Sequence, residues 1–103
     1  METTGGNTKF NYADVKSAAG TLRAIDNKIR QQILKLLEEN KRVIVTDIYA
    51  KLHLGQSVTS SHLGILRRAN IVITERDRRV IYYSLNHTHI AVVSDFINKM
   101  INK

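Results

Sequence analysis

The sequence has no cysteine among its 103 residues, which excludes disulfides, thiolate metal sites, cysteine nucleophiles and direct thiol redox sensing. It has no proline either, so other residues must end its helices. No apolar run approaches the roughly 20 residues of a membrane-spanning helix. The N-terminus lacks the basic and apolar regions of a secretory signal. We therefore expect a cytoplasmic protein without a membrane partner.

The motifs of common enzymes are also missing. There is no glycine-rich phosphate loop and no nucleophile elbow. Glu38 and Glu39 are adjacent on a predicted helix, where they point in different directions. None of the four histidines has an Asp or Glu at a spacing that suggests a catalytic pair. We expect neither catalysis nor a cofactor.

Positive charge is in excess, because 16 Lys and Arg stand against 9 Asp and Glu, a net charge of +7. This balance favours polyanions, nucleic acid first, although a basic domain without such a partner has the same composition. The placement of the charge decides between these readings. Five arginines stand against two acids between Arg67 and Arg79, which favours nucleic acid.

The length predicts one domain with a small core. Residues 1–11 are mostly small and polar, so we expect a flexible N-terminal tail, followed by one folded domain over 12–103. From Asp14, apolar residues follow a helical spacing up to Ile25. Asp26 and Asn27 offer a break and a cap. The next helix, up to Asn40, carries the widest apolar stripe and is the expected centre of the core: Ile29, Ile33, Leu34, Leu36 and Leu37.

The middle of the chain predicts two helices in tandem. Thr46 is the expected N-cap of a short helix over 47–52, after a β-branched run over 43–45. A tight turn over 53–55 follows, with Gly55 free to be left-handed. The second helix, over 56–69, is anchored by Leu63 and Leu66, while its first turns are mostly small and hydrogen-bonding. Such residues are mediocre helix formers but suit contact with base edges and phosphates.

After Asn70 the pattern becomes β-branched and aromatic over 71–76 and 79–85, which predicts a hairpin around Asp77 and Arg78. Asp-Arg is weaker turn chemistry than Asn-Gly, so a longer loop is possible. Helical spacing returns from Asn86 to Lys103, with Asn86 or Thr88 as its cap. The fold class is mostly α with a small β-hairpin: a winged helix-turn-helix of about five helices, with the wing before the last one.

In such a fold the first helix of the pair supports the second, and the second lies in the major groove of DNA. The spacing of matching residues resembles the ArsR-type (arsenic-repressor-like) winged helix-turn-helix regulators from about Leu22 onward. The matching residues are Asp47, Ile48, Leu52, Gln56, Ser57, Ser60, Ser61, His62, Leu63, Leu66, Arg67, Ala69, Asn70, Ile71, Tyr83, Ser84 and Leu85. Asn70 replaces the usual glycine and tolerates the same left-handed backbone. Val58 and Thr59 are in the reverse of the usual order.

The resemblance implies that Gln56, Ser57, Ser60 and Ser61 face the groove and that the hairpin arginines contact phosphates. The candidate DNA-binding residues are Thr46, Gln56, Ser57, Val58, Ser60, Ser61, His62, Arg67, Arg68, Arg76, Arg78 and Arg79. Two of them have an alternative role. Gln56 could be an exposed cap residue, and His62 could fill the boundary between the helix and the core.

Many members of the family sense metals, but the resemblance places Ile44 and Thr46 at the two thiolate positions, and neither binds a soft metal. A second family site would use His87 and His89 with Met100 and Lys103, which are poor zinc ligands. We predict no metal site. A weak site that a dimer completes, for example with Asp95, stays open.

The resemblance also implies pairing of the first and last helices across a two-fold axis. The candidate interface residues are Val15, Ala18, Leu22, Ile90, Val93, Ile97, Met100 and Ile101. The alternative is that they fill the core of a monomer. A homodimer predicts a near-palindromic operator in double-stranded DNA, and the family favours a repressor over an activator. The competing reading is a protein- or RNA-interaction module. The sequence identifies neither the operator nor an effector.

Overall fold

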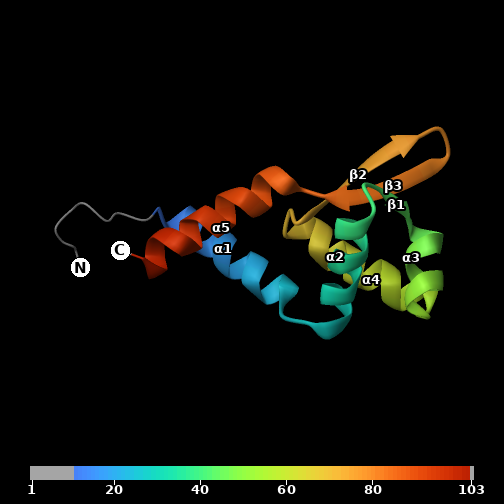
Figure 1. The fold of residues 1–103 in the computed structure, drawn as a ribbon, viewed down its shortest axis with the longest axis horizontal. Helices are drawn as coiled ribbons and strands as arrows, with labels where there is room; N and C mark the ends of the chain where they lie inside the picture. The colour runs from blue at the N-terminus through green and yellow to red at the C-terminus, as the bar shows by residue number, and fades with distance from the viewer. Residues whose placement is uncertain (1–10, 103) are drawn as a thin grey trace.

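The computed structural model describes residues 11–102. The elements follow in the order α1 (Tyr12–Ile25), α2 (Lys28–Glu39), β1 (Val43–Ile44), α3 (Val45–Leu52), α4 (Gln56–Arg68), β2 (Val72–Asp77), β3 (Val80–Leu85) and α5 (His87–Ile101) (Figure 1). The mostly helical fold, with a hairpin before the last of five helices, is therefore confirmed. The predicted tail lies outside the described residues except for Asn11, whose side chain accepts a hydrogen bond from the Ala13 N–H at 2.7 Å.

Asparagine side chains cap the start of three helices, and two of these caps, Asn27 and Asn86, were among the predicted ones. Besides Asn11, the Asn27 side chain accepts from the Arg30 N–H at 3.0 Å at the start of α2. The Asn86 side chain accepts from the His89 N–H at 3.1 Å at the start of α5. Each bond satisfies a backbone donor that the first helical turn leaves free.

Two non-glycine residues with positive φ end α3 and α4. His53 has φ 55°, and the N–H groups of His53 and Leu54 donate back to Ala50 and Tyr49. Asn70 has φ 62°, as its place in the sequence pattern predicted, and the pattern of returning bonds is the same. This pair of bonds satisfies the last free carbonyls of a helix. The expectation of a left-handed Gly55 was wrong, because the left-handed residue after α3 is His53, two positions earlier, and Gly55 is the extended N-cap of α4.

Thr46 does not cap α3, contrary to our prediction. The helix begins at Val45, after Ile44, and no side chain caps it. The chain passes directly from strand to helix here, because Val43 and Ile44 pair with Tyr83 and Tyr82 of β3. Thr46 is exposed in the first turn.

The hairpin forms part of a three-stranded antiparallel sheet in the order β1-β3-β2. Asp77 pairs with Val80, so the turn consists of Arg78 and Arg79, one residue later than predicted and without a longer loop. Arg78 takes the left-handed backbone, with φ 61°.

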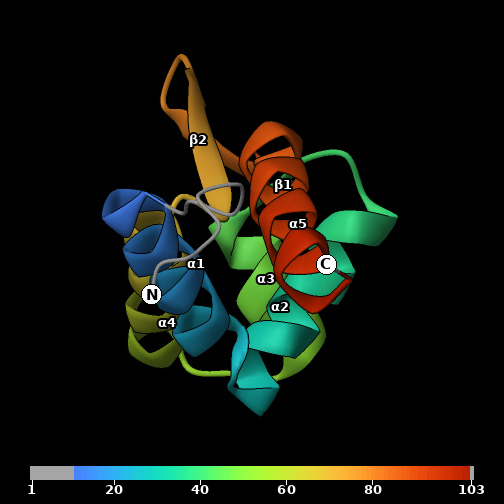
Figure 2. The same ribbon diagram turned by 90° about the vertical axis from the view of Figure 1, so that its left-hand side faces the viewer.

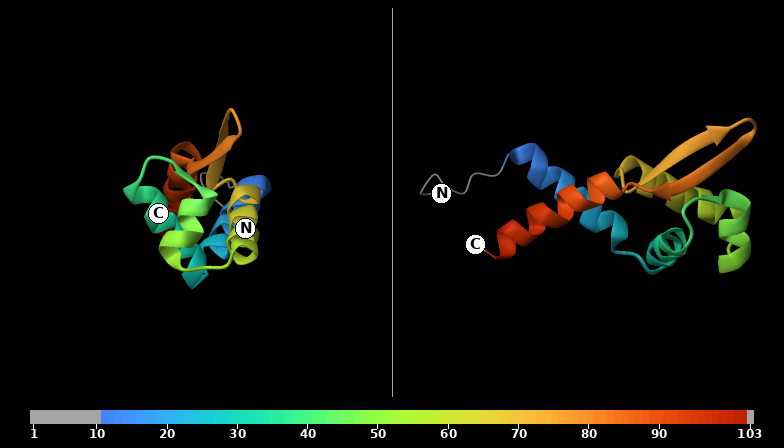
Figure 3. Two further views of the ribbon diagram at one scale, coloured as in Figure 1. Left: turned by 90° about the vertical axis from the view of Figure 1, so that its right-hand side faces the viewer. Right: turned by 45° about the horizontal axis from the view of Figure 1, so that its top comes forward.

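The core lies where α2, α3, α4 and the base of the sheet meet. Its fully buried side chains include Ile33 of α2, Ile48 of α3, and Leu63 and Leu66 of α4. Helices α1 and α5 leave this core side by side (Figures 1 and 2), and the wing projects at the opposite end (Figure 3). The fold is consequently elongated, with extents of 52 × 27 × 20 Å. None of the helices in the described part of the chain has the length and apolarity needed to cross a bilayer.

Candidate nucleic-acid interface

Helix α4 is held against α3 by buried side chains and by its own first turn. Thr59, Leu63 and Leu66 are buried on one side of α4. Thr59 also donates through Oγ1 to the Gly55 carbonyl at 2.9 Å. A side chain that both fills the core and bonds the cap residue restricts how α4 can rotate about its axis.

The opposite side of α4 is exposed in its first two turns and in its last turn, while Gly64 and Ile65 between them are half-buried. Its first two turns expose small or hydrogen-bonding side chains and one valine, which were all predicted as site residues: Gln56, Ser57, Val58, Ser60 and Ser61. Arg67 and Arg68 are exposed in its last turn. The structure thus brings seven of the predicted residues together on one continuous helix.

His62 points away from this exposed side. It is half-buried, and its Nδ1 lies 3.1 Å from Nη1 of Arg30 on α2. Because a guanidinium only donates, Nδ1 must accept and the ring proton belongs on Nε2. Desolvation by burial, and after it the charge of Arg30, lowers the pKa of His62 below its usual value. The neutral imidazole that this bond needs is therefore the favoured form at neutral pH.

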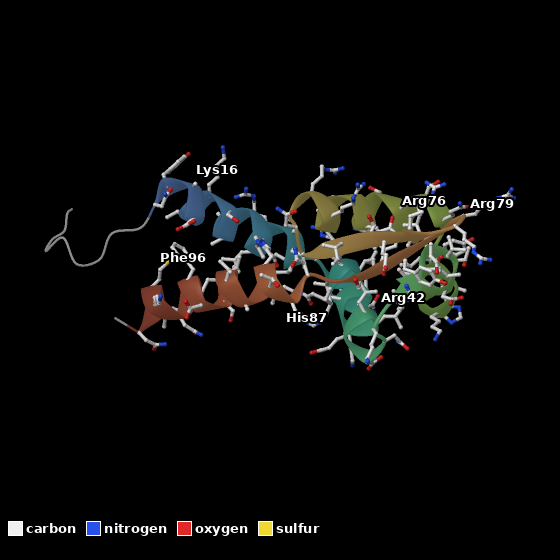
Figure 4. All side chains as sticks on the ribbon, turned by 90° about the horizontal axis from the view of Figure 1, so that it is seen from above. Lys16, Arg42, Arg76, Arg79, His87 and Phe96 are labelled. Atoms are coloured by element: carbon white, nitrogen blue, oxygen red, sulfur yellow. The ribbon has the colours of Figure 1, made fainter. Side chains whose placement is uncertain are left out.

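The wing carries the second group of predicted residues. Arg76, Arg78 and Arg79 are exposed at and beside the turn, and Figure 4 shows Arg76 and Arg79 at the free end of the hairpin. Arg76 Nε donates to the Arg78 carbonyl at 3.1 Å, which ties the side chain to the turn. Within residues 11–102, no carboxylate forms an ion pair with these three arginines. Their charge is free to meet an external anion.

Arg42 joins the base of the wing to the domain, and sequence reasoning missed it. Its guanidinium lies 4.0 Å from the centroid of the Tyr82 ring, and its Nη1 lies 3.2 Å from Oε1 of Glu75. Glu75 was counted against the wing's positive charge, but its partner comes from outside the hairpin. The contact spans 33 positions in the sequence, so no local signal could have found it.

The predicted interface residues on α1 and α5 divide into three groups by their exposure. Ala18 and Val93 are 5% and 6% exposed, so they pack within the chain and leave little surface for a partner. Ile90 and Ile97 are half-buried. The other four are exposed, by 39% to 72%: Val15, Leu22, Met100 and Ile101.

The two histidines considered for a metal lie near the start of α5. His87 is exposed, and His89 Nε2 lies 3.1 Å from the Thr21 hydroxyl of α1. In the described part of the chain, no three His, Cys, Asp or Glu residues come together in a group that could hold a metal. The absence of a metal site stays a prediction, because a second chain could add ligands.

Comparison with known proteins gives consistent matches. A family model described as "Bacterial regulatory protein, arsR family" matches residues 27–74, which contain the whole helix-turn-helix. The transcriptional activator HlyU of Vibrio cholerae is 32% identical over 79 residues, covering 77% of this chain and 72% of that protein. The transcriptional repressor SdpR of Bacillus subtilis is 36% identical over 80 residues, covering 78% and 84%. The crystal structure of the transcriptional repressor PagR of Bacillus anthracis has a TM-score of 0.71 and 28% identity, covering 89% of this chain and all of that one.

Proposed function

The chain belongs to the ArsR family of bacterial regulatory proteins and is a DNA-binding transcriptional regulator, and from that premise we propose that it binds a near-palindromic operator as a homodimer and represses transcription. One observation carries this proposal. A rigidly held helix exposes hydrogen-bonding side chains beside a wing whose arginines have no acidic partner within residues 11–102.

The first two turns of α4 contact the bases in this proposal. The Gln56 amide can pair with adenine in the major groove, and the hydroxyls of Ser57, Ser60 and Ser61 can donate to or accept from several bases. Val58, which is 45% exposed, suits the methyl group of thymine. We assign His62 a positioning role, because its Nδ1 is occupied by Arg30.

The arginines that flank this surface bind the DNA phosphates in this proposal. Arg67 and Arg68 follow α4, while Arg76, Arg78 and Arg79 extend the contact along the wing. Guanidinium groups match phosphate oxygens in a bidentate geometry. Thr46 adds an exposed hydroxyl in the first turn of α3.

The homodimer would form along α1 and α5, which extend from the core and expose Val15, Leu22, Met100 and Ile101. Residues 12–103 would then serve both DNA binding and dimerisation as one domain. A two-fold axis places two recognition helices about 34 Å apart, one turn of DNA. Repression by occupying a promoter requires no further surface, and two of the similar proteins are named repressors, although one is named an activator.

Fluorescence anisotropy tests the proposal. The probes are a labelled duplex from the chain's own upstream region and a scrambled duplex, each at two salt concentrations. We expect a preference of about 10³-fold or more for the first duplex and a steep salt dependence. Replacing Gln56 with Ala should relax the preference, while Arg78→Gln should weaken binding to both duplexes alike.

Two outcomes separate the alternatives. Equal, weak binding to both duplexes would move the search to operators selected from random sequence. No binding to any duplex at low salt would refute the DNA reading and favour a protein-interaction module. A monomeric mass by light scattering at micromolar concentration would refute the dimer independently.

A further inference from the structure

A pocket lies between α1, α2 and α4, and it shares one residue, Arg68, with the proposed DNA-binding surface. It is lined by Gly20, Arg23, Ala24, Arg30, Ile65, Arg68 and Ala69. Three helices each contribute one arginine, and every other lining residue is apolar or glycine. No carboxylate is among the lining residues, so the pocket concentrates positive charge without neutralising it.

Arg30 is the fixed arginine of the three. Its Nε donates to the Ala24 carbonyl, its Nη2 to the Arg23 carbonyl at 3.5 Å, and its Nη1 to His62 Nδ1 at 3.1 Å. The two carbonyls belong to the last turn of α1, where the helix dipole is negative and attracts a cation. These bonds hold the guanidinium at the junction of the three helices.

A glycine makes room for one of the other two arginines, Arg68. A Cβ at Gly64 would lie 3.3 Å from Nη1 of Arg68, so the Arg68 side chain lies back along its own helix over Gly64. A Cβ at Gly20 would lie 3.9 Å from Nη2 of Arg23. Neither arginine forms an ion pair with a carboxylate of residues 11–102. Both side chains are exposed and can turn toward an anion.

We infer that the pocket formed by Arg23, Arg30 and Arg68 binds a phosphate group. Guanidinium groups are planar donors that match phosphate oxygens two at a time, and a fixed donor flanked by two movable ones can enclose a tetrahedral anion. The reduced pKa of His62 is consistent with positive potential here, since Arg30 is its second cause after burial.

The phosphate can come from the backbone of bound DNA or from a soluble phosphate compound. The surface around the pocket favours DNA. Lys16, Gly20 and Arg23 recur at the spacing of one helix face, and Figure 4 shows Lys16 on the same side of the molecule as Arg76 of the wing. The DNA source rests on the proposed function, whereas the phosphate site itself does not.

The first arm of the test uses no DNA. Inorganic phosphate, and separately adenosine monophosphate, are titrated into the full chain while the arginine Nε–H signals are followed by NMR, with chloride at equal ionic strength as the blank. We expect saturable shifts of the Arg23, Arg30 and Arg68 signals, lost in Arg23→Gln. The control Lys35→Gln removes one exposed charge that lies beside a different groove and should keep the shifts.

The second arm measures the salt dependence of duplex binding for Arg23→Gln, Arg68→Gln and the double variant. Each lost phosphate contact lowers the log–log slope by about 0.9 with duplex DNA. If both arginines hold one phosphate, each single variant loses about one contact, and the double variant loses little more. Lys35→Gln should leave the slope unchanged.

The outcomes are distinct. A reduced, non-additive slope assigns the pocket to the DNA backbone, and saturable binding of free phosphate with an unchanged slope assigns it to a soluble compound. Additive loss of two contacts would overturn the shared pocket in DNA binding, and an unchanged slope with no saturable shifts would overturn the inference altogether. If the unmodified chain binds no duplex, the proposed function fails, but the first arm still decides whether the pocket binds phosphate.

Discussion

The two ends of this molecule are built differently. In the helix-turn-helix half, buried side chains from three helices and the sheet fix the recognition helix, and returning hydrogen bonds close both α3 and α4. In the half formed by α1 and α5, the buried residues are Ala18, Thr21, Ala24 and Val93, while larger apolar residues are exposed. The first half has a complete core of its own. The second has apolar surface that one chain does not cover, so its order should depend more on a partner.

The largest effect should come from breaking the first half. Leu63→Ala removes a side chain that is 1% exposed between α4 and the core, so we expect a loss of about 2–5 kcal/mol in the free energy of unfolding. Urea denaturation followed by circular dichroism measures it. Ile73→Thr, at a position 48% exposed on the wing, is the control and should change stability by less than about 1 kcal/mol. A loss below 1 kcal/mol for Leu63→Ala would mean that this core is not the centre of stability.

Breaking the second half should separate the chains of the proposed homodimer without unfolding them. Leu22 is 47% exposed on α1, so Leu22→Glu costs the monomer little but would bury two carboxylates in a dimer. Burying an unpaired charge costs several kcal/mol, so we expect a largely monomeric mass at micromolar concentration. Light scattering measures the mass and circular dichroism confirms the helices. An unchanged dimeric mass would place the interface elsewhere, and Lys28→Glu, at an exposed position of α2, is the charge control.

A smaller effect should follow from loosening the wing. Arg42→Gln removes the contact with the Tyr82 ring and the ion pair with Glu75. The Arg42 side chain is 45% exposed and the Glu75 side chain is 70% exposed. At such exposure we expect no more than about 1 kcal/mol of stability to be lost. Hydrogen exchange should nevertheless quicken in β2 and β3 relative to α4. Lys41→Gln, at the neighbouring exposed position, should leave the exchange rates unchanged.

The smallest effect should be a pH dependence carried by His62. Its pKa is lowered in the folded chain, so the unfolded chain binds the proton more readily, and the stabilisation is present above about pH 6.5 and is lost as the pH falls through the folded value. Between pH 7.5 and 5.5 the Tm should fall more steeply for the unmodified chain than for His62→Gln. Equal slopes would show that His62 does not carry this pH dependence.

The sequence predicted best where the evidence was local. The stripe around Ile33, the asparagine caps and the left-handed Asn70 all depend on neighbours within one or two helical turns. Errors occurred where a distant strand changed a local choice. Thr46 has the chemistry of a cap, but pairing of Ile44 with β3 moved the start of the helix upstream.

Contacts between distant segments could not be predicted at all. Arg30 with His62, and Arg42 with Glu75, join residues more than thirty positions apart. The periodicity of a single sequence reports which neighbouring residues share a face, and it gives no signal for pairs so far apart. The exposed side of α4 was nevertheless predicted, because helix spacing alone decides that Ser57 and Ser61 lie opposite Thr59, Leu63 and Leu66.

The hydrogen bond between Thr21 and His89 has a consequence for how related regulators stay distinct. Apolar contacts between α1 and α5 would still form if one helix slid along the other by a turn. The hydrogen bond between Thr21 and His89, which is partly buried and joins residues 68 positions apart, forms in only one alignment of the two helices. The outward residues of the two helices can then diverge while their alignment is retained. In the homodimer that we propose, changes confined to that outer surface would keep the subunits of related regulators from mixing and would leave the helix-turn-helix half untouched.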